Sequence, residues 1–238
     1  MYKEGTYFQD PNRHSEDASY KVEAIKKVLF RYLKENGIQL SSYADVGCGS
    51  GEIIKLLGKD LKLNFQTLQV IKGFDVSPHV EKLKDNHIDF LLQDFTKSNE
   101  KFDLVTLNDV FEHVVNPISF LTEVGRRTKY VVMHIPLEDC LSVNIRNLQK
   151  RKIVNPGHLI FLNINSAINL ITYSGLKIVD YEYSIKSINA PSNNFTILQK
   201  IVYPLKYVLL KANPYLYSRI FGISLIVIAE GIDFGYEK

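Results

Sequence analysis

The sequence has little of what marks a secreted or membrane-spanning protein. Its 238 residues include only two cysteines, Cys48 and Cys140, which argues against a disulfide framework and against a cysteine-based metal site. No run of about 18 apolar residues occurs, so we expect no helix that crosses a membrane. The N-terminal residues are polar and lack the apolar core of a signal peptide, and we therefore expect a reducing, cytoplasmic location.

A strong charge of either sign is also missing. The chain has 29 Lys and Arg against 26 Asp and Glu, and the net charge of +3 is too small to indicate a nucleic-acid partner. Hydrophobic residues make up 45% of the chain and charged residues 23%, which is ordinary for a globular protein with a sizeable core. The length predicts a single domain over 1–238 with a small cap.

The segment 45–51 reads Asp-Val-Gly-Cys-Gly-Ser-Gly, with glycine at every second position from Gly47 to Gly51. The residues that follow, Glu-Ile-Ile-Lys-Leu-Leu, look like the first turns of a helix. A strand, a glycine loop and a helix bring the backbone of an α/β sheet against a ligand, because glycine adopts positive φ and has no Cβ. A dinucleotide fingerprint would need a third glycine where Glu52 or Ile54 stands, and a P-loop would need a lysine directly after the glycines.

The rest of the chain alternates between strand and helix patterns, which predicts an α/β fold with a largely parallel sheet. An irregular arm precedes a helix predicted over residues 16–36, which Asn36-Gly37 would end. Ser77-Pro78 and Pro117 are typical helix starts, and a short helix is expected over 165–174. Seven strands are predicted: one leading into the glycine loop, and others at 70–76, 88–92, 102–108, 130–136, 176–185 and 223–229.

Two segments interrupt this alternation and are predicted to form a cap on the substrate side. Residues 137–160 carry a basic cluster and are expected to lie over the carboxyl edge of the sheet. Residues 190–220 are rich in tyrosine and lysine, and no acidic residue occurs from Tyr183 to Ala229. Two interpretations stay open: a solvated amphipathic cap, or a surface for a phosphate-bearing acceptor or for peripheral contact with a membrane.

The glycine loop resembles motif I of the class I S-adenosylmethionine (SAM)-dependent methyltransferases. Residues 102–126, FDLVTLNDVFEHVVNPISFLTEVGR, resemble the stretch after strand four in the small-molecule branch of that family, which includes quinone-pathway O-methyltransferases. Residues 157–182, GHLIFLNINSAINLITYSGLKIVDYE, resemble a later passage of the same branch. The resemblance implies a Rossmann-like, seven-stranded sheet whose last strand is antiparallel, with helices on both faces and SAM as cofactor.

By this resemblance the cofactor would lie against the glycine loop and the ends of the next strands. Asp75 could accept hydrogen bonds from both ribose hydroxyls, although an Asp before Ser-Pro also forms turns. Asp94 could accept from the adenine amino group, with Phe95 along the ring, although Asp94 also suits a helix start. Asp45 could order the loop amides or reach the methionine ammonium through water, and Asn108 would lie by the methionine moiety. The predicted cofactor-binding residues are Asp45, Gly47, Cys48, Gly49, Gly51, Asp75, Val76, Gln93, Asp94, Phe95 and Asn108, with Cys48 interpreted as a small residue that fits the loop.

Methyl transfer from a sulfonium is an in-line displacement, so the protein mainly has to align the acceptor, and a hydroxyl acceptor also needs a base. His113 and His134 are the predicted catalytic residues, with His158 as a further candidate, because imidazole titrates near neutral pH. The resemblance places Glu112-His113 near the transferred methyl group, which makes His113 the first choice. Each histidine has a structural role as its alternative.

Asp109, Glu112 and His113 also allow a metal interpretation, since positions i, i+3 and i+4 share a face if one helical turn holds them. Some similar quinone-pathway enzymes have Glu in place of the first acid. Asp109 is shorter than Glu, which argues against a divalent metal, and helix capping and packing are the alternative for these residues.

We therefore expect SAM-dependent methyl transfer to a small molecule or a glycan precursor, with O-transfer slightly favoured over N-transfer. An RNA or protein methyltransferase is disfavoured, because no Asn/Asp-Pro-Pro-Tyr/Phe motif occurs and no basic domain is appended. Glu52 disfavours a nucleotide-dependent oxidoreductase. A non-catalytic SAM-binding protein would keep the same glycines and acids, and only turnover distinguishes it from an enzyme.

Overall fold

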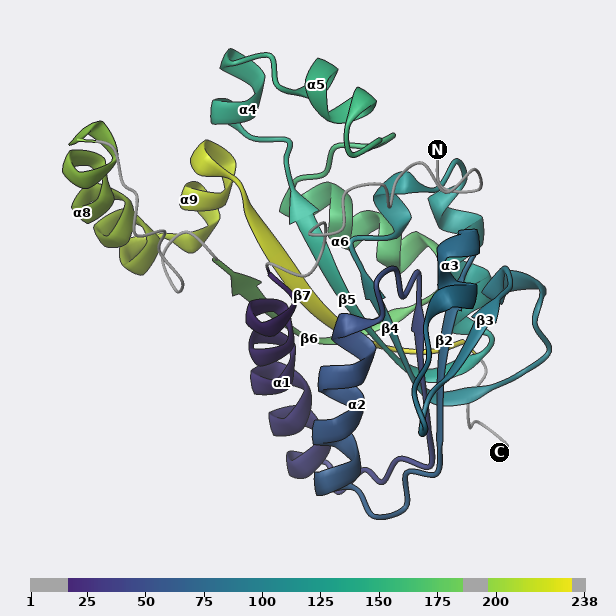
Figure 1. The fold of residues 1–238 in the computed structure, drawn as a ribbon. Coiled ribbons are helices and arrows are strands. Elements are labelled where there is room, and N and C mark those ends of the chain that lie inside the picture. The colour runs from purple at the N-terminus through teal and green to yellow at the C-terminus, as the bar shows by residue number, and fades with distance from the viewer. Residues whose placement is uncertain (1–16, 186–196, 233–238) are drawn as a thin grey trace.

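A seven-stranded sheet forms the frame of the protein (Figure 1). The computed structural model describes residues 17–185 and 197–232. Its strands are β1 (Ser42–Val46), β2 (Val70–Asp75), β3 (Asp89–Leu92), β4 (Phe102–Asn108), β5 (Thr128–Leu137), β6 (Lys177–Ser184) and β7 (Ile223–Glu230). They lie in the order β3-β2-β1-β4-β5-β7-β6, and β7 runs antiparallel to the other six strands. The predicted Rossmann-like sheet with an antiparallel last strand is confirmed.

Helices cover both faces of this sheet, because successive side chains of a strand point to opposite sides. Leu104 of β4 packs in one core with α1 (Ala18–Glu35) and α2 (Glu52–Asn64). Its neighbour Val105 packs in a second core with α3 (Pro117–Gly125) and α6 (Ile164–Tyr173). Each face of the sheet therefore has its own apolar core.

The first helix, α1, confirms the predicted helix over 16–36 within the described residues. Its buried side chains recur at helical spacing, from Ala18 through Val22 and Ile25 to Leu33. The helix ends at Glu35, and Gly37 adopts a φ of +62°, a conformation that glycine takes without steric cost.

Three short 3₁₀ helices lie at the carboxyl edge of the sheet. They are η2 (Pro78–Lys82), η3 (Phe95–Lys97) and η4 (Phe111–His113). Ser77 does start a helix, as predicted, but η2 has only five residues. The predicted helical turn that would hold Asp109, Glu112 and His113 is also shorter than expected, because η4 begins after Asp109.

The cap consists of helices beyond the strand ends and beside β7 (Figure 1). Residues 137–160 contain α4 (Leu141–Ile145) and α5 (Gln149–Val154), which follow the carboxyl end of β5. The second cap segment forms α8 (Ile197–Ala212) and α9 (Pro214–Phe221), and α9 packs against both α4 and α8. The predicted arm at 1–15 and residues 190–196 of the cap lie outside the described residues. None of the helices that the structure describes is long and apolar enough to cross a membrane.

Candidate cofactor and acceptor site

A cavity of about 730 Å³ opens at the carboxyl ends of β1, β2 and β4. Its position is where the strand order reverses, since β1 has β2 on one side and β4 on the other. Ten predicted cofactor residues line it: Asp45, Gly47, Cys48, Gly49, Asp75, Val76, Gln93, Asp94, Phe95 and Asn108. Gly51 does not line the cavity; it adopts a φ of +78° at the start of α2, where an added Cβ would lie 3.1 Å from Leu83.

The glycine loop is shaped by positive φ angles and close packing. Gly47 and Gly49 have φ values of +74° and +54°. A Cβ on Gly47 would lie 2.7 Å from Val110 Cγ2, so a larger residue would force Val110 to move. The amides of Gly47 and Cys48 both donate to the carbonyl of Phe74, at 2.8 and 3.1 Å, which ties the loop to β2. Cys48 is buried, in keeping with its interpretation as a small packing residue.

Asp75 holds the loop from the end of β2. Its Oδ2 accepts a hydrogen bond from the Gly49 amide at 2.8 Å, and its Oδ1 accepts one from the Ser77 amide at 2.8 Å. Burial raises the pKa of Asp75, although these amide bonds act in the opposite direction. The ordering of loop amides, which we predicted for Asp45, therefore belongs to Asp75, and Asp75 also makes the turn that its position before Ser-Pro predicts.

Asp45 has a different set of partners. Its Oδ1 accepts from Thr106 Oγ1 at 2.6 Å and from Asn108 Nδ2 at 3.0 Å. Burial raises the pKa of Asp45 to about 7. Asn108 Oδ1 is buried and has no hydrogen-bond partner among the described residues. This orphaned acceptor at the cavity wall would suit a donor such as the ammonium of a methionine moiety, so the residues present fit SAM.

Asp94 and Phe95 line the cavity just after the end of β3. Asp94 Oδ1 accepts from the amide and the hydroxyl of Thr96, at 3.0 and 2.7 Å, and so caps η3. Asp94 therefore fills the helix-start role and also lines the cavity. Phe95 is almost fully buried and meets Phe74 edge to face, with ring centroids 5.0 Å apart.

Asp109 belongs to an ion-paired group, not to the predicted metal set. It accepts from Lys21 Nζ at 2.7 Å and from His134 Nδ1 at 2.6 Å. Burial would raise the pKa of Asp109, but the charges of His134 and Lys21 outweigh it and hold that pKa below its usual range. His134 is buried against Asp109 and is not among the residues that line the cavity, so we no longer place it at the acceptor.

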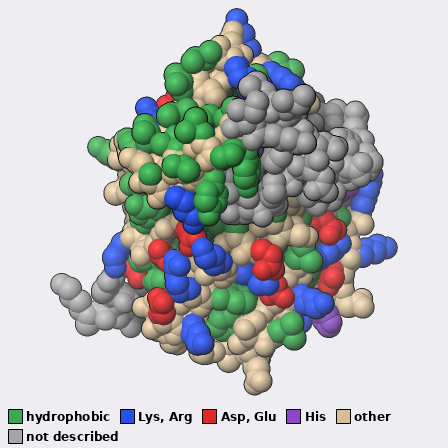
Figure 2. Space-filling model, turned by 90° about the vertical axis from the view of Figure 1, so that its left-hand side faces the viewer, with side chains coloured by type: hydrophobic (Ala, Val, Ile, Leu, Met, Phe, Trp, Pro, Cys, Tyr) green, Lys and Arg blue, Asp and Glu red, His purple; other side chains and the backbone are tan. Residues whose placement is uncertain are grey.

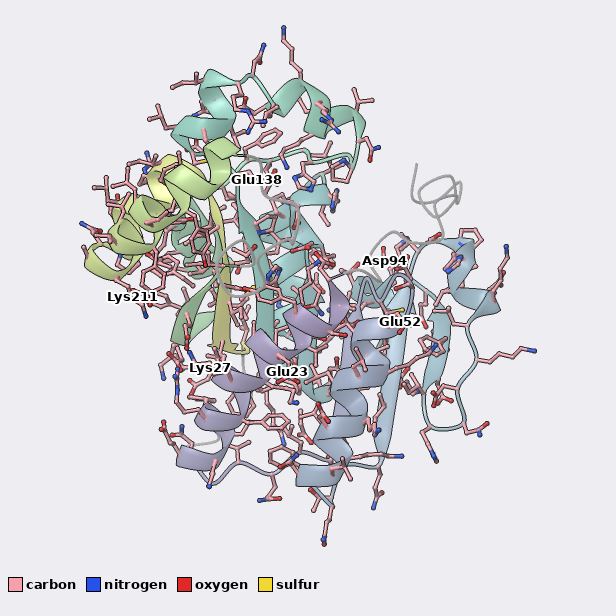
Figure 3. All side chains as sticks on the ribbon, turned by 60° about the vertical axis from the view of Figure 1, so that its left-hand side comes forward. Glu23, Lys27, Glu52, Asp94, Glu138 and Lys211 are labelled. Carbon is pink, nitrogen blue, oxygen red and sulfur yellow. The ribbon has the colours of Figure 1, made fainter. Side chains whose placement is uncertain are left out.

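Glu112, His113 and His158 come together instead. Their candidate ligand atoms lie within 4.8 Å of one another, and the two imidazole rings meet edge to face at 4.7 Å. His113 Nδ1 lies 3.0 Å from the Gly157 carbonyl, and His158 Nδ1 lies 2.7 Å from Glu138 Oε2. Since both partners accept, each Nδ1 carries a proton, and in the neutral form of each ring the lone pair is on Nε2. Figure 3 shows Glu138 at the end of β5, beneath α4 and α5.

The carboxyl group of Glu112 is the most unusual member of this cluster. The residue is 1% exposed, and neither oxygen has a hydrogen-bond partner among the described residues. Burial, followed by the charge of Asp109, raises the pKa of Glu112 well above its usual range. Such a group is costly unless it stays protonated or meets a ligand, which makes this cluster a candidate functional site.

Lys21 is a cavity residue that we did not predict. It reaches Asp109 from α1, and the charges of Asp109 and Asp17 raise its pKa although burial opposes them. A signal was present in the sequence: Lys21 falls on the apolar side of the helix, three residues after Ala18 and four before Ile25.

The family described as a methyltransferase domain matches residues 14–181, which is more than half of the chain. The chain belongs to the methyltransferase domain family. The predictions of the SAM-dependent methyltransferase family and of this enzyme class are thereby confirmed. No curated protein matches this chain in sequence.

Solved structures share the fold of this methyltransferase at low identity. The N-methyltransferase NodS from Bradyrhizobium japonicum WM9, in complex with S-adenosyl-L-homocysteine (SAH), is 13% identical with a TM-score of 0.55, and 97% of each chain is covered. The magnesium protoporphyrin IX methyltransferase ChlM from Synechocystis PCC 6803, with bound SAH, is 15% identical with a TM-score of 0.54, covering 97% of this chain and 93% of that one. StiE O-MT, residues 961–1257, is 15% identical with a TM-score of 0.57, covering 94% and 80%.

Replacing Asp75 with alanine should weaken SAM binding by about 1.5–3 kcal/mol, because the carboxylate that anchors Gly49 and can meet the ribose is lost. Calorimetry on the folded variant measures the change. Asp85→Ala is the matched control, since exposed Asp85 also accepts from the amide two residues on, in a turn that does not line the cavity. Equal losses in both variants, or none in either, would remove Asp75 from the cofactor site.

Gly49→Ala should lower SAM affinity at least tenfold, because a Cβ would stand where the backbone approaches the cofactor. Gly37→Ala is its control: Gly37 also has positive φ, but it lies before β1, whereas the loop follows β1, and it does not line the cavity. Both changes should lower the free energy of unfolding by about 1–2 kcal/mol, so thermal unfolding should not separate them. If Gly49→Ala kept its affinity for SAM, this loop would not be where the cofactor binds.

The free energy of unfolding should depend on pH through the protonation of Asp45. Its pKa is about 7 in the folded chain, so between about pH 4 and pH 7 the folded state holds a proton that the unfolded state releases. This group therefore makes stability fall as pH rises through that window, by about 4 kcal/mol at most. Urea unfolding at pH 5 and pH 7.5 should show a smaller fall in Asp45→Asn than in the wild type. A wild-type-to-variant difference that does not change with pH would contradict the shift.

Proposed function

We propose that this methyltransferase moves a methyl group from SAM to a small molecule or a glycan precursor, with oxygen slightly favoured over nitrogen as the acceptor atom. The observation that carries the proposal is that two groups of residues line one cavity. The first group is the glycine loop, Asp75 and the unpartnered Asn108 oxygen, which suit the cofactor. The second is His113, which clusters with Glu112 and His158.

SAM supplies an electrophilic methyl group on a sulfonium. The chain's contribution is to align the acceptor with that methyl and to take up the proton that a hydroxyl acceptor loses as its oxygen gains the methyl. His113 is the residue we place in that role. Its Nδ1–H is held by the Gly157 carbonyl, which orients the ring and leaves Nε2 as the basic nitrogen. An amine acceptor would need alignment only, provided that it enters neutral.

A divalent cation held by Glu112, His113 and His158 is a second candidate for the same end of the site. The unpartnered, buried Glu112 oxygens favour it, and so does the Glu138 carboxylate behind His158, since metal-binding histidines often donate their other N–H to a carboxylate. This set replaces the predicted one, in which Asp109 stood in the place of His158.

The shared fold does not select the acceptor, because the N-methyltransferase NodS and the protein named StiE O-MT resemble this chain equally well. The basic cap supports an acceptor that carries phosphate, which we propose as the class to screen first, alongside phenols and amines. A screen that follows label from methyl-labelled SAM tests this directly. A folded protein that fails to bind SAM in calorimetry would overturn the proposed function.

His113→Ala should lower the turnover rate by about 10²–10⁴-fold while SAM affinity stays within a few-fold of the wild type, if His113 is the base. The pH–rate profile should then lose its acidic limb. His87→Ala, an exposed histidine outside the cavity, is the control and should keep the wild-type rate.

EDTA separates the two candidates. If the cation is required, EDTA should inactivate the wild type, an added divalent metal should restore it, and His158→Ala should match His113→Ala. If His113 is the base alone, EDTA should have no effect. A fully active His113→Ala enzyme that resists EDTA would contradict both.

A further inference from the structure

The cap exposes apolar side chains on several neighbouring helices. Ile145 at the end of α4 and Val154 at the end of α5 are 74% and 71% exposed, and Leu205 and Val208 of α8 are 66% and 62% exposed. The helices form a connected layer, because α4 leads into α5 and α9 packs against both α4 and α8. We call the exposed side of α4, α5, α8 and α9 the cap face. Isolated apolar residues on a surface are ordinary, but a group of them on adjoining elements indicates a binding surface.

The same face is basic and lacks acids. The sequence contains no Asp or Glu from 140 to 179 or from 183 to 229. Exposed Arg146, Lys150 and Arg151 make no ion pair with any carboxylate in the part of the chain that the structure describes. In Figure 2 the hydrophobic side chains gather on the upper part of the molecule, with Lys and Arg at their margin, whereas most of the acids in view lie below. Figure 3 shows Lys211 on α8, at the outer side of the cap.

We propose that the cap face docks on an anionic lipid membrane, with its apolar side chains in the interface and its basic side chains against the headgroups. Apolar residues flanked by unpaired Lys and Arg on a helical surface are the chemistry that binds such a bilayer. A second copy of the chain fits less well, because two faces of the same positive charge would repel each other. The proposal concerns binding and does not depend on which acceptor is methylated.

The position of the cap face gives docking a consequence for the site. The α4–α5 segment leads directly into His158, whose ring meets His113, and the Leu159 amide donates to the Glu112 carbonyl at 2.8 Å. The α4–α5 part of the cap face and His158 of the acceptor end therefore belong to one continuous stretch of chain. A membrane-bound protein would hold its acceptor end at the bilayer edge, where an acceptor with a lipid anchor would be presented.

Co-sedimentation of the full chain with unilamellar vesicles tests the proposal. The wild type should bind phosphatidylcholine vesicles that contain phosphatidylglycerol at least tenfold more tightly than pure phosphatidylcholine vesicles, and added salt should weaken this binding. The triple variant R146Q/K150Q/R151Q should lose at least tenfold in affinity for the anionic vesicles. The matched triple K34Q/K59Q/K84Q removes the same charge from exposed lysines elsewhere and should stay within twofold of the wild type.

Apolar contact is tested separately from charge. Two double variants remove apolar side chains: I145S/V154S on α4 and α5, and L205S/V208S on α8. Each should lower vesicle binding at least fivefold. The control Leu63→Ser, at an exposed leucine on α2, should not. Circular dichroism confirms that each variant is folded. The proposal is overturned if the wild type does not bind anionic vesicles, or if the control triple loses as much as the cap triple. Size-exclusion chromatography tests the wild type for dimerisation. If the wild type does not bind vesicles but forms a dimer that the cap-face variants disrupt, the proposal is overturned in favour of a second copy.

Discussion

The carboxylate of Asp75 is the contact on which the cavity depends. One oxygen takes the amide of Gly49 in the loop after β1, and the other takes the amide of Ser77 in the turn after β2. Two neighbouring parallel strands thus have their carboxyl ends fastened to a single side chain. The loop can then keep the positive φ angles that open it toward the cavity, because its amides have fixed partners and need no ligand to stay ordered.

Most of the fold could be predicted from the sequence, because local patterns report local structure. Strand β4 was predicted with the bounds that the structure gives, since four of its seven residues are apolar and charged residues flank it. Gly47, Gly49, Asp75 and Asp94 could be placed in the cavity for a similar reason: residues that end parallel strands meet at one edge of the sheet. The antiparallel last strand came from the resemblance and not from periodicity, and the order of the strands was not predicted.

The acceptor end could be predicted only in part, because its members come from distant parts of the chain. Asp109 and His113 looked like a pair four residues apart, but a φ of +53° at Asp109 turns its side chain toward Lys21 and His134. His158 reaches the same place from the cap, after more than forty intervening residues. Spacing rules describe neighbours within one element, so they could not report that a loop from the cap replaces the first acid of the predicted set.

The ion pair between Lys21 and Asp109 also changes what the first helix is. A helix that precedes the first strand of the sheet could be taken for a dispensable accessory. Here its lysine pairs with an acid that lines the cavity, and its apolar side completes one of the two cores. Trimming the chain to the sheet would remove one of the two groups that compensate the buried Asp109 charge and leave only His134, with another buried carboxyl group, Glu112, close by. The folded unit that builds the cavity therefore includes this helix.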